Sequence, residues 1–277
     1  MPDTQLNTLT LLPASRTVTW QRPVGIVLLV LVALFAWLTP LLTGIDPARQ
    51  TLSDSLLPPS AAHWLGTDVL GRSVLARLAY AAQLSLGLAL LAAVTAAVPG
   101  VLLGVLASWC GGRIERALVM LADAVLAVPG LLLVLLFAAL APGRHWALYV
   151  GLSLSLWVEY FRVSRAASRP IFASDAVQAS RLLGFGALYL LQRHLLPALA
   201  PLLTTLLAFS VAQAVLALAA LGFIGVGLQP PTAELGLMMI EFLPSYEEAP
   251  WLMAAPVTLL MLVVLAMMLM TLDRQAS

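Results

Sequence analysis

The amino-acid sequence predicts an all-α polytopic membrane protein with six transmembrane helices. Of its 277 residues, 61% are hydrophobic and only 10% are charged, and the mean hydropathy is +0.99. Soluble proteins carry about 25% charged residues, and a water-soluble domain cannot hide this much apolar surface. The apolar residues also fall into six windows, each long enough to cross a bilayer core of about 30 Å as a helix of about 20 residues.

The composition also excludes several functional classes. The 14 basic residues are all arginine, and a P-loop needs a lysine to reach the phosphates of ATP, so this chain is not itself a P-loop ATPase. The single cysteine, Cys110, cannot form an intrachain disulfide or a thiolate metal site. His63, His145 and His194 stand far apart, and no H-E-x-x-H motif occurs, so no metal site is expected. The net charge of +1 gives no indication of nucleic-acid binding.

The first two spans follow a cytoplasmic tail at residues 1–23. The first span is expected at 24–43, which is uncharged, and Thr39–Thr43 offers no A-x-A cleavage site, so it is not a signal peptide. A polar periplasmic segment is expected at 44–83. The second span fits at about 84–107, before a turn at Gly111 and Gly112.

The other four spans, with the second, make up a five-helix core at 84–272. The third is expected at 117–141, interrupted by Asp123 and Pro129, and the fourth, the least apolar, at 146–164. After a polar loop at 165–196 the fifth is placed at 198–221. The uncharged run 194–233 is long enough for two helices, but its later part is rich in glycine and proline and makes a poor lipid-facing helix. The last span is 251–272, and 273–277 is a tail.

The arginine distribution orients these spans, because cytoplasmic loops of membrane proteins are enriched in basic residues. With the N-terminus inside, the cytoplasmic segments hold Arg16, Arg22, Arg113, Arg116, Arg162, Arg165, Arg169, Arg181, Arg193 and Arg274, and the outer segments hold only Arg49, Arg72, Arg77 and Arg144. Both termini and the 165–196 loop are therefore expected in the cytoplasm, with the chain in the inner membrane. Two helices within 194–233 would move the C-terminus outside.

The 165–196 loop has the pattern of two short helices. Ser174 is a good N-cap residue, and Asp175 suits the positive end of a helix that runs to Leu183. Gly184 then suits the C′ position, where φ is often positive. A second helix is expected from 186 to about 194, stopped by Pro197. The small face of the first helix (Ala176, Ala179, Ser180 and Leu183) favours docking into a groove of a partner protein, although an amphipathic loop lying on the lipid headgroups would show the same pattern.

Four motifs carry a family resemblance over roughly residues 24 to 272. Gln178-Ala179-Ser180, Gly184 and the His194–Pro197 segment resemble the Glu-Ala-Ala loop of ABC importer membrane subunits. Three more stretches resemble the second permease subunit of dipeptide, oligopeptide and nickel importers: His63–Asp68 with Leu70–Arg72, Phe223–Pro231, and the set Trp157, Tyr160, Arg162 and Arg165. The chain departs from the family at Gln178 (usually Glu), at Ser180 (often Ala), at Ser73 (Asp) and at its ending.

The resemblance implies a type I ABC importer permease fold and a division of labour among subunits. This chain would form half of a translocation path with a sister permease, and two separate ATPase subunits would bind ATP-Mg, so the chain needs no cofactor and is not an enzyme. A periplasmic binding protein would deliver peptides or nickel chelates. The coupling loop would act through Asp175, Gln178, Ala179, Ser180, Gly184, His194 and Pro197, with Gly184 as the hinge between its two helices.

Polar residues within the spans are candidates for the path or for structural pairing, because charges at membrane depth usually face protein or water. Asp123 and Glu159 would line or gate the path, or they would form ion pairs, Asp123 with Arg116 or Arg162 and Glu159 with Arg162. In the fifth span Thr205, Ser210, Gln213 and Gly222 would line the path or bridge helices. The competing functions are a secondary transporter, which usually shows internal repeats that are not seen here, and a scaffold subunit with a loop that does not couple.

Overall fold

The computed structural model describes residues 20–272, and in this range the chain is all-helical, apart from loops and one isolated bridge between Thr67 and Ser73. The long helices are α1 (Gln21–Thr43), α2 (Val74–Cys110), α5 (His145–Ala173), α8 (Leu196–Ile224) and α10 (Pro250–Leu272). The shorter ones are α3 (Gly112–Leu126), α4 (Gly130–Leu140), α6 (Asp175–Leu182), α7 (Ala187–Leu190) and α9 (Leu235–Phe242). The all-α expectation is confirmed.

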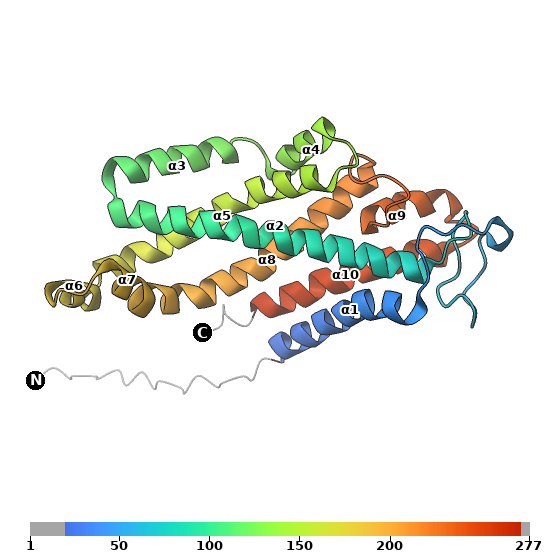
Figure 1. Cartoon of the computed structure of the whole chain (residues 1–277), viewed down its shortest axis with the longest axis horizontal. Helices are drawn as coiled ribbons and strands as arrows, with labels where there is room; N and C mark the ends of the chain where they lie inside the picture. Colours follow the sequence, from blue (N-terminus) through green and yellow to red (C-terminus); the bar gives the residue numbers. More distant parts are fainter. Residues whose placement is uncertain (1–19, 273–277) are drawn as a thin grey trace, which may run out of the picture.

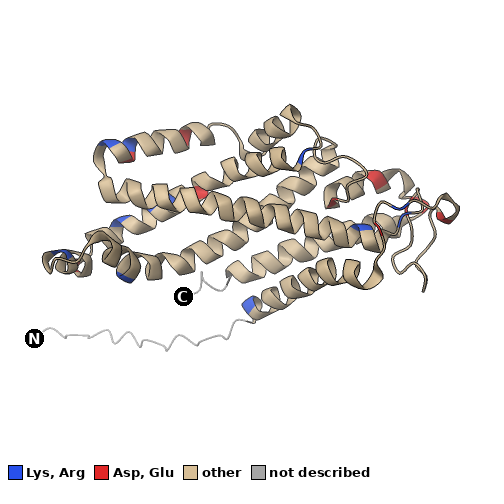
Figure 2. Ribbon diagram, viewed as in Figure 1, with Lys and Arg blue, Asp and Glu red and all other residues tan. Residues whose placement is uncertain are grey.

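The long helices lie side by side along one axis and give the molecule two distinct ends (Figure 1). The α6 end carries α6 and α7, which project beyond the other helices, and both the start of α1 and the end of α10 point toward it. The opposite end, called the α9 end here, carries α9 and the segment 44–73. Arg, Asp and Glu gather mainly at these two ends, while the helices between them are mostly uncharged (Figure 2), as a bilayer requires.

Within residues 20–272, four helices are long and apolar enough to cross a membrane, and a fifth span is counted if α3 and α4 form one broken span. The break falls at Pro129, the N-cap residue of α4, and bends the pair by 71°, since proline disfavours a helical conformation in the residue before it. The expected fourth span, α5, has 29 residues, but its serines, Glu159 and Arg162 lower its hydropathy. Length and composition therefore do not confirm six spans.

Three helix boundaries show the largest differences from the sequence prediction. Helix α2 begins at Val74 rather than at residue 84, because Ser73 caps it by accepting a bond from the Ala76 N–H (3.4 Å). Helix α5 continues to Ala173 instead of ending at 164. Pro197 does not stop the helix that precedes it, because the π-helical turn Leu191–Leu195 widens the backbone there and α7 continues into α8.

Helices α2 and α5 approach closely through two glycines. A β-carbon at Gly100 would lie 2.5 Å from the Trp157 carbonyl oxygen, and one at Gly104 would lie 2.5 Å from that of Phe161. Both positions on α2 are buried and four residues apart, the spacing that lets membrane helices bring their backbones together. This contact fixes the position of α5, the helix on which the candidate sites depend.

We therefore expect Gly104→Val to destabilise the chain by about 1–3 kcal/mol, because the added side chain would overpack the α2–α5 contact. Gly87→Val on the same helix is the matched control, since a β-carbon at Gly87 meets no atom within 4 Å. Thermal unfolding of the detergent-purified protein measures both variants. Equal melting temperatures for the two would contradict the assigned contact.

Candidate functional site

The segment at the α6 end forms the two expected helices around Gly184. Helix α6 runs from Asp175 to Leu182, and Gly184 follows it with φ of +81°, so the predicted left-handed position is confirmed. Ser174 occupies the N-cap position, but its hydroxyl donates to the Ile171 carbonyl (2.7 Å) and does not cap α6. The amide of Gln178 donates to the Ala173 carbonyl (3.1 Å) and so ties α6 to the end of α5.

Side-chain contacts close the two helices of this segment against each other. The hydroxyl of Ser180 and Nε2 of His194 lie 3.1 Å apart, which brings two of the sequence-predicted residues together. Tyr189 stacks on Phe185 with ring centroids 4.2 Å apart and meets the His194 ring edge-on. The segment is thus a defined helical hairpin with its own polar and aromatic contacts.

The hairpin presents an apolar surface to solvent. Leu182 is 90% exposed, Leu183 76% and Leu188 67%, and the small residues Ala176 and Ala179 are exposed as well. Exposed apolar patches of this kind mark surfaces that contact either a partner protein or a membrane. The sequence predicted the small-residue face of α6 but missed Leu182 and Leu188, because neither belongs to that face.

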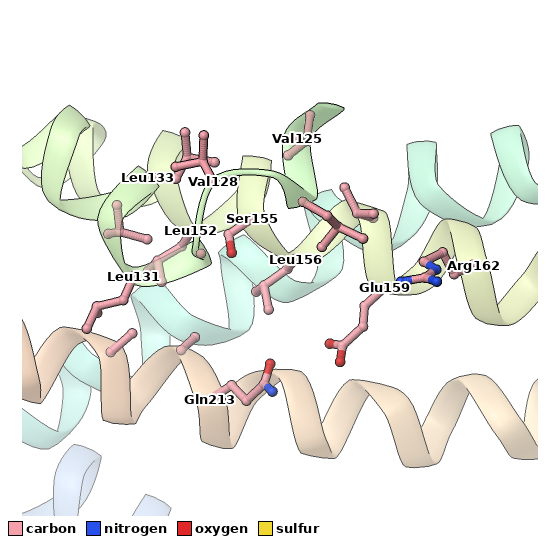
Figure 3. Close-up of a pocket in the computed structure, with 16 residues that line it drawn as sticks. Val125, Val128, Leu131, Leu133, Leu152, Ser155, Leu156, Glu159, Arg162 and Gln213 are labelled. Carbon is pink, nitrogen blue, oxygen red and sulfur yellow. The ribbon is translucent and has the colours of Figure 1, made fainter. Parts of the chain in front are cut away.

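A cavity of about 400 Å³ lies where α5 and α8 meet the break between α3 and α4 (Figure 3). Its walls are mostly apolar, and its polar residues are Ser155, Glu159, Arg162 and Gln213. The Glu159 carboxylate extends from α5 toward Gln213 on α8, whereas the Arg162 guanidinium lies beside α5 (Figure 3). Three of the residues singled out from the sequence therefore line one cavity.

The expected ion pairs of Glu159 and Asp123 do not form. Among the residues that the structure describes, no basic nitrogen lies within 4.0 Å of either carboxylate. Glu159 points across the cavity, away from Arg162, and Asp123 is exposed on α3. The ion pairs near this region instead join α3 to α5, because Glu115 accepts from Arg165 (2.8 Å) and lies 3.8 Å from Arg169.

The other residues of the predicted path occupy different surroundings on α8. Thr205 and Gln213 line a second cavity of about 470 Å³ between α5, α8 and α10. Ser210 is buried, close to Tyr160. Gly222 is buried where α9 crosses α8, and a β-carbon there would lie 2.8 Å from the backbone nitrogen of Leu237. Only Thr205 and Gln213 therefore share an open face.

A buried cluster of four charges joins the elements of the α9 end, and the sequence analysis missed it. Asp68 and Arg77 are fully buried, 2.6 Å apart, and Asp68 also lies 2.6 Å from Arg72. Both arginines contact Glu241 of α9. Two positive and two negative charges cancel, which makes their burial tolerable. The Thr67-Asp68 and Gly71-Arg72 stretches, noted only for their resemblance to a motif, build this cluster.

Helix α9, which the sequence analysis also missed, begins at a buried carboxylate. Glu234 is 2% exposed, and its Oε2 accepts from the Leu237 N–H (2.8 Å). Burial raises the pKa of Glu234 above its ordinary value of 4.5, against the lowering effect of the Leu237, Gly236 and Leu235 N–H groups and the Ser85 hydroxyl. In the described part of the chain no three His, Cys, Asp or Glu residues are arranged to hold a metal ion.

Comparison with known proteins identifies related sequences along most of the chain. Residues 100–275 match the family described as "Binding-protein-dependent transport system inner membrane component". The di/tripeptide permease DppC of Pseudomonas aeruginosa (strain UCBPP-PA14) is 38% identical over 255 residues, which are 89% of this chain and 83% of that protein. The nickel permease NikC of Escherichia coli (strain K12) is 30% identical over 79% of each chain.

A solved structure shares the fold. A chain of the inward-facing MetNI methionine ABC transporter aligns with a TM-score of 0.55 and 20% identity, covering 70% of this chain and 91% of that one. This likeness concerns the fold alone, and it agrees with the importer permease fold that the motifs imply.

The raised pKa of Glu234 predicts a pH-dependent stability. Because the folded state holds this proton more tightly than the unfolded state, the stability it contributes is full below pH 4.5 and is lost as the pH rises through the folded-state pKa. We expect Glu234→Gln, which keeps the acceptor for Leu237, to remove that loss. The loss of stability is measured from the melting temperatures of the wild type and the variant between pH 4.5 and 8. Glu247→Gln, which replaces an exposed glutamate, is the control. Parallel pH curves for wild type and Glu234→Gln would contradict the assignment.

Proposed function

The chain belongs to the family of binding-protein-dependent transport system inner membrane components, and we propose that it forms one half of the solute path of an ABC importer whose ATPase subunits are separate chains. Its role as the permease component follows from the family. Our proposal adds the assembly: a heterodimer with a sister permease, two ATPase subunits that bind ATP-Mg, and a periplasmic binding protein. The single observation that carries it is the exposed helical hairpin of α6 and α7.

The topology that fits this assembly has six spans with both termini in the cytoplasm of a bacterial cell. Helix α5, the fourth in chain order, brings the number of spans to six. It can cross the membrane despite its polar residues, because it lies between other helices and not against lipid alone. It packs on α2 through Gly100 and Gly104, and Gly151 packs on Val134 of α4. The α6 end then faces the cytoplasm, where the ATPase subunits would be, and the α9 end faces the periplasm. The arginine distribution supports the same orientation.

The hairpin has the properties that docking to an ATPase requires. It projects beyond the other helices, it exposes leucines, and its internal contacts hold its shape. Gln178, which stands where the importer motif that it resembles has glutamate, donates a hydrogen bond that a carboxylate could not donate. The departure from the family motif therefore supports an α6 that is fixed to the end of α5 by a hydrogen bond, rather than a loop that has lost its coupling role. This weakens the scaffold alternative.

The solutes that we propose are short peptides or nickel chelates. The names of the relatives give peptides and nickel, and they include an oligopeptide permease OppC of Bacillus subtilis (strain 168), 30% identical over 234 residues. Thr205 and Gln213 are the strongest candidates for the path on α8, because both border open space. A secondary transporter finds no support in these relatives.

We expect Ala179→Asp to abolish copurification of the ATPase subunits with this chain. The substitution places an unpaired charge in an exposed apolar docking surface, where desolvation on docking would cost several kcal/mol. The complex is purified in mild detergent through a tag on this chain, and its ATPase activity is measured. Ala61→Asp, at an exposed alanine of the α9 end, is the matched control. Retention of the ATPase by the Ala179→Asp chain would overturn the docking role of α6.

Gly184→Val tests the hinge between α6 and α7. Valine at φ of +81° is strained by about 1 kcal/mol or more, so we expect normal membrane insertion but loss of uptake. Gly186→Val is the control, because Gly186 has φ of −73° and a β-carbon there meets no atom within 4 Å. Solute uptake and membrane abundance are measured together. Normal uptake by the Gly184→Val chain would rule out the hinge.

A further inference from the structure

Two opposite charges line the cavity between α5, α8 and the α3–α4 break without neutralising each other. Glu159 and Arg162 both contribute to its wall. Neither is within 4.0 Å of an oppositely charged group among the described residues. Among the residues that the structure describes, they are also the only charged residues in the lining.

The two charged side chains point in different directions from α5. Glu159 sits near the middle of α5 and extends across the cavity toward the Gln213 amide on α8 (Figure 3). Arg162, one turn later, keeps its guanidinium beside α5. The surrounding wall is apolar, with Leu131, Leu152 and Leu156 among its members. Glu159 is half-buried, so its unpaired carboxylate carries a desolvation cost that a ligand cation would offset, whereas Arg162 is exposed and its guanidinium is accessible to a ligand anion.

We propose that Glu159 and Arg162 bind the two ends of a zwitterionic solute, an ammonium at Glu159 and a carboxylate at Arg162. A guanidinium suits a carboxylate because it donates two parallel hydrogen bonds. The Gln213 amide both donates and accepts, so it serves the polar groups between the two ends. The cavity of about 400 Å³ falls within the range of small-molecule sites, about 300–1,000 Å³.

This inference rests on the proposed permease function and narrows its solute class. An unmodified short peptide carries an ammonium and a carboxylate at its ends and matches both residues. A metal chelate with charge of one sign needs only one of them. The arrangement therefore assigns the cavity to amino-acid-like zwitterions rather than to nickel complexes. The rival explanation is that charges of the sister permease neutralise Glu159 and Arg162 in the assembled importer.

The test measures solute occupancy directly in the permease–ATPase complex without its binding protein. Ser155, which lines the cavity, is replaced by cysteine as a reporter, and exposed Cys110 is replaced by serine. Protection of the reporter from a maleimide is titrated with three probes. Ala-Ala carries both charges, Ala-Ala amide carries only the ammonium, and N-acetyl-Ala-Ala carries only the carboxylate.

The expected result is a charge-matched pattern across the probes. Glu159→Gln should raise the half-protecting concentration of Ala-Ala and Ala-Ala amide about tenfold and leave N-acetyl-Ala-Ala unchanged. Arg162→Gln should raise that of Ala-Ala and N-acetyl-Ala-Ala and leave Ala-Ala amide unchanged. Glu247→Gln, which removes an exposed carboxylate outside the cavity, is the matched control. Glu159→Asp should retain most of the protection.

Three outcomes overturn the inference: equal shifts for all three probes, no shifts, or no protection of the wild-type reporter by Ala-Ala. As a check on assembly, each variant should react with the maleimide at the wild-type rate when no probe is present, and it should still bind the ATPase. Uptake into proteoliposomes with the binding protein separates this failure from failure of the proposed function. If a nickel chelate is taken up with ATP but Ala-Ala does not protect the reporter cysteine, the zwitterion site alone is rejected. If no solute is taken up with ATP, the importer function is rejected.

Discussion

The close approach of α2 and α5 is the constraint on which the rest of the structure depends. In a bilayer the lipid tails are as apolar as the helices, so helix association relies on packing and not on exclusion of water. Gly100 and Gly104 allow that packing by bringing backbone against backbone. One side of α5 is thereby committed to α2. This leaves Glu159 on the side that faces α8, and it lets α5 carry serines, a carboxylate and an arginine through the middle of the protein.

The α9 end is organised by a buried cluster of charges together with close glycine contacts. Asp68, Arg72, Arg77 and Glu241 form a neutral cluster that joins the segment 44–73 and α9 to the first turn of α2. Because each buried charge has a partner of opposite sign, removal of any one would leave another uncompensated. Glycines again permit the approach of backbones, since a β-carbon at Gly236 would lie 2.6 Å from the Ala219 carbonyl carbon. The α9 end thus combines buried charge pairs with close contacts between helix backbones.

Much of this fold is predictable from the sequence, and the failures have identifiable causes. The apolar windows locate the spans, and Ser174, Asp175 and Gly184 predict α6 and its end, because these signals are local. The start of α2 was missed since Arg77 looks like a polar loop residue until its distant partners are known. Pro197 was misjudged because a π-helical turn, invisible in the sequence, accommodates it. The cavity could not be foreseen, since its wall comes from three separate parts of the chain.

The continuity of α7 with α8 has a mechanical consequence. From Ala187 to Ile224 the backbone is one rod of 38 residues, about 57 Å long at 1.5 Å per residue. Helix α5 is a second rod. Helix α6 and Gly184 connect the end of α5 to the start of α7, so the two rods are joined at one end only. Both rods form walls of the cavity that contains Glu159 and Gln213. If Gly184 acts as the proposed hinge, a change of the angle between α6 and α7 would change the gap between those walls and therefore the width of the cavity.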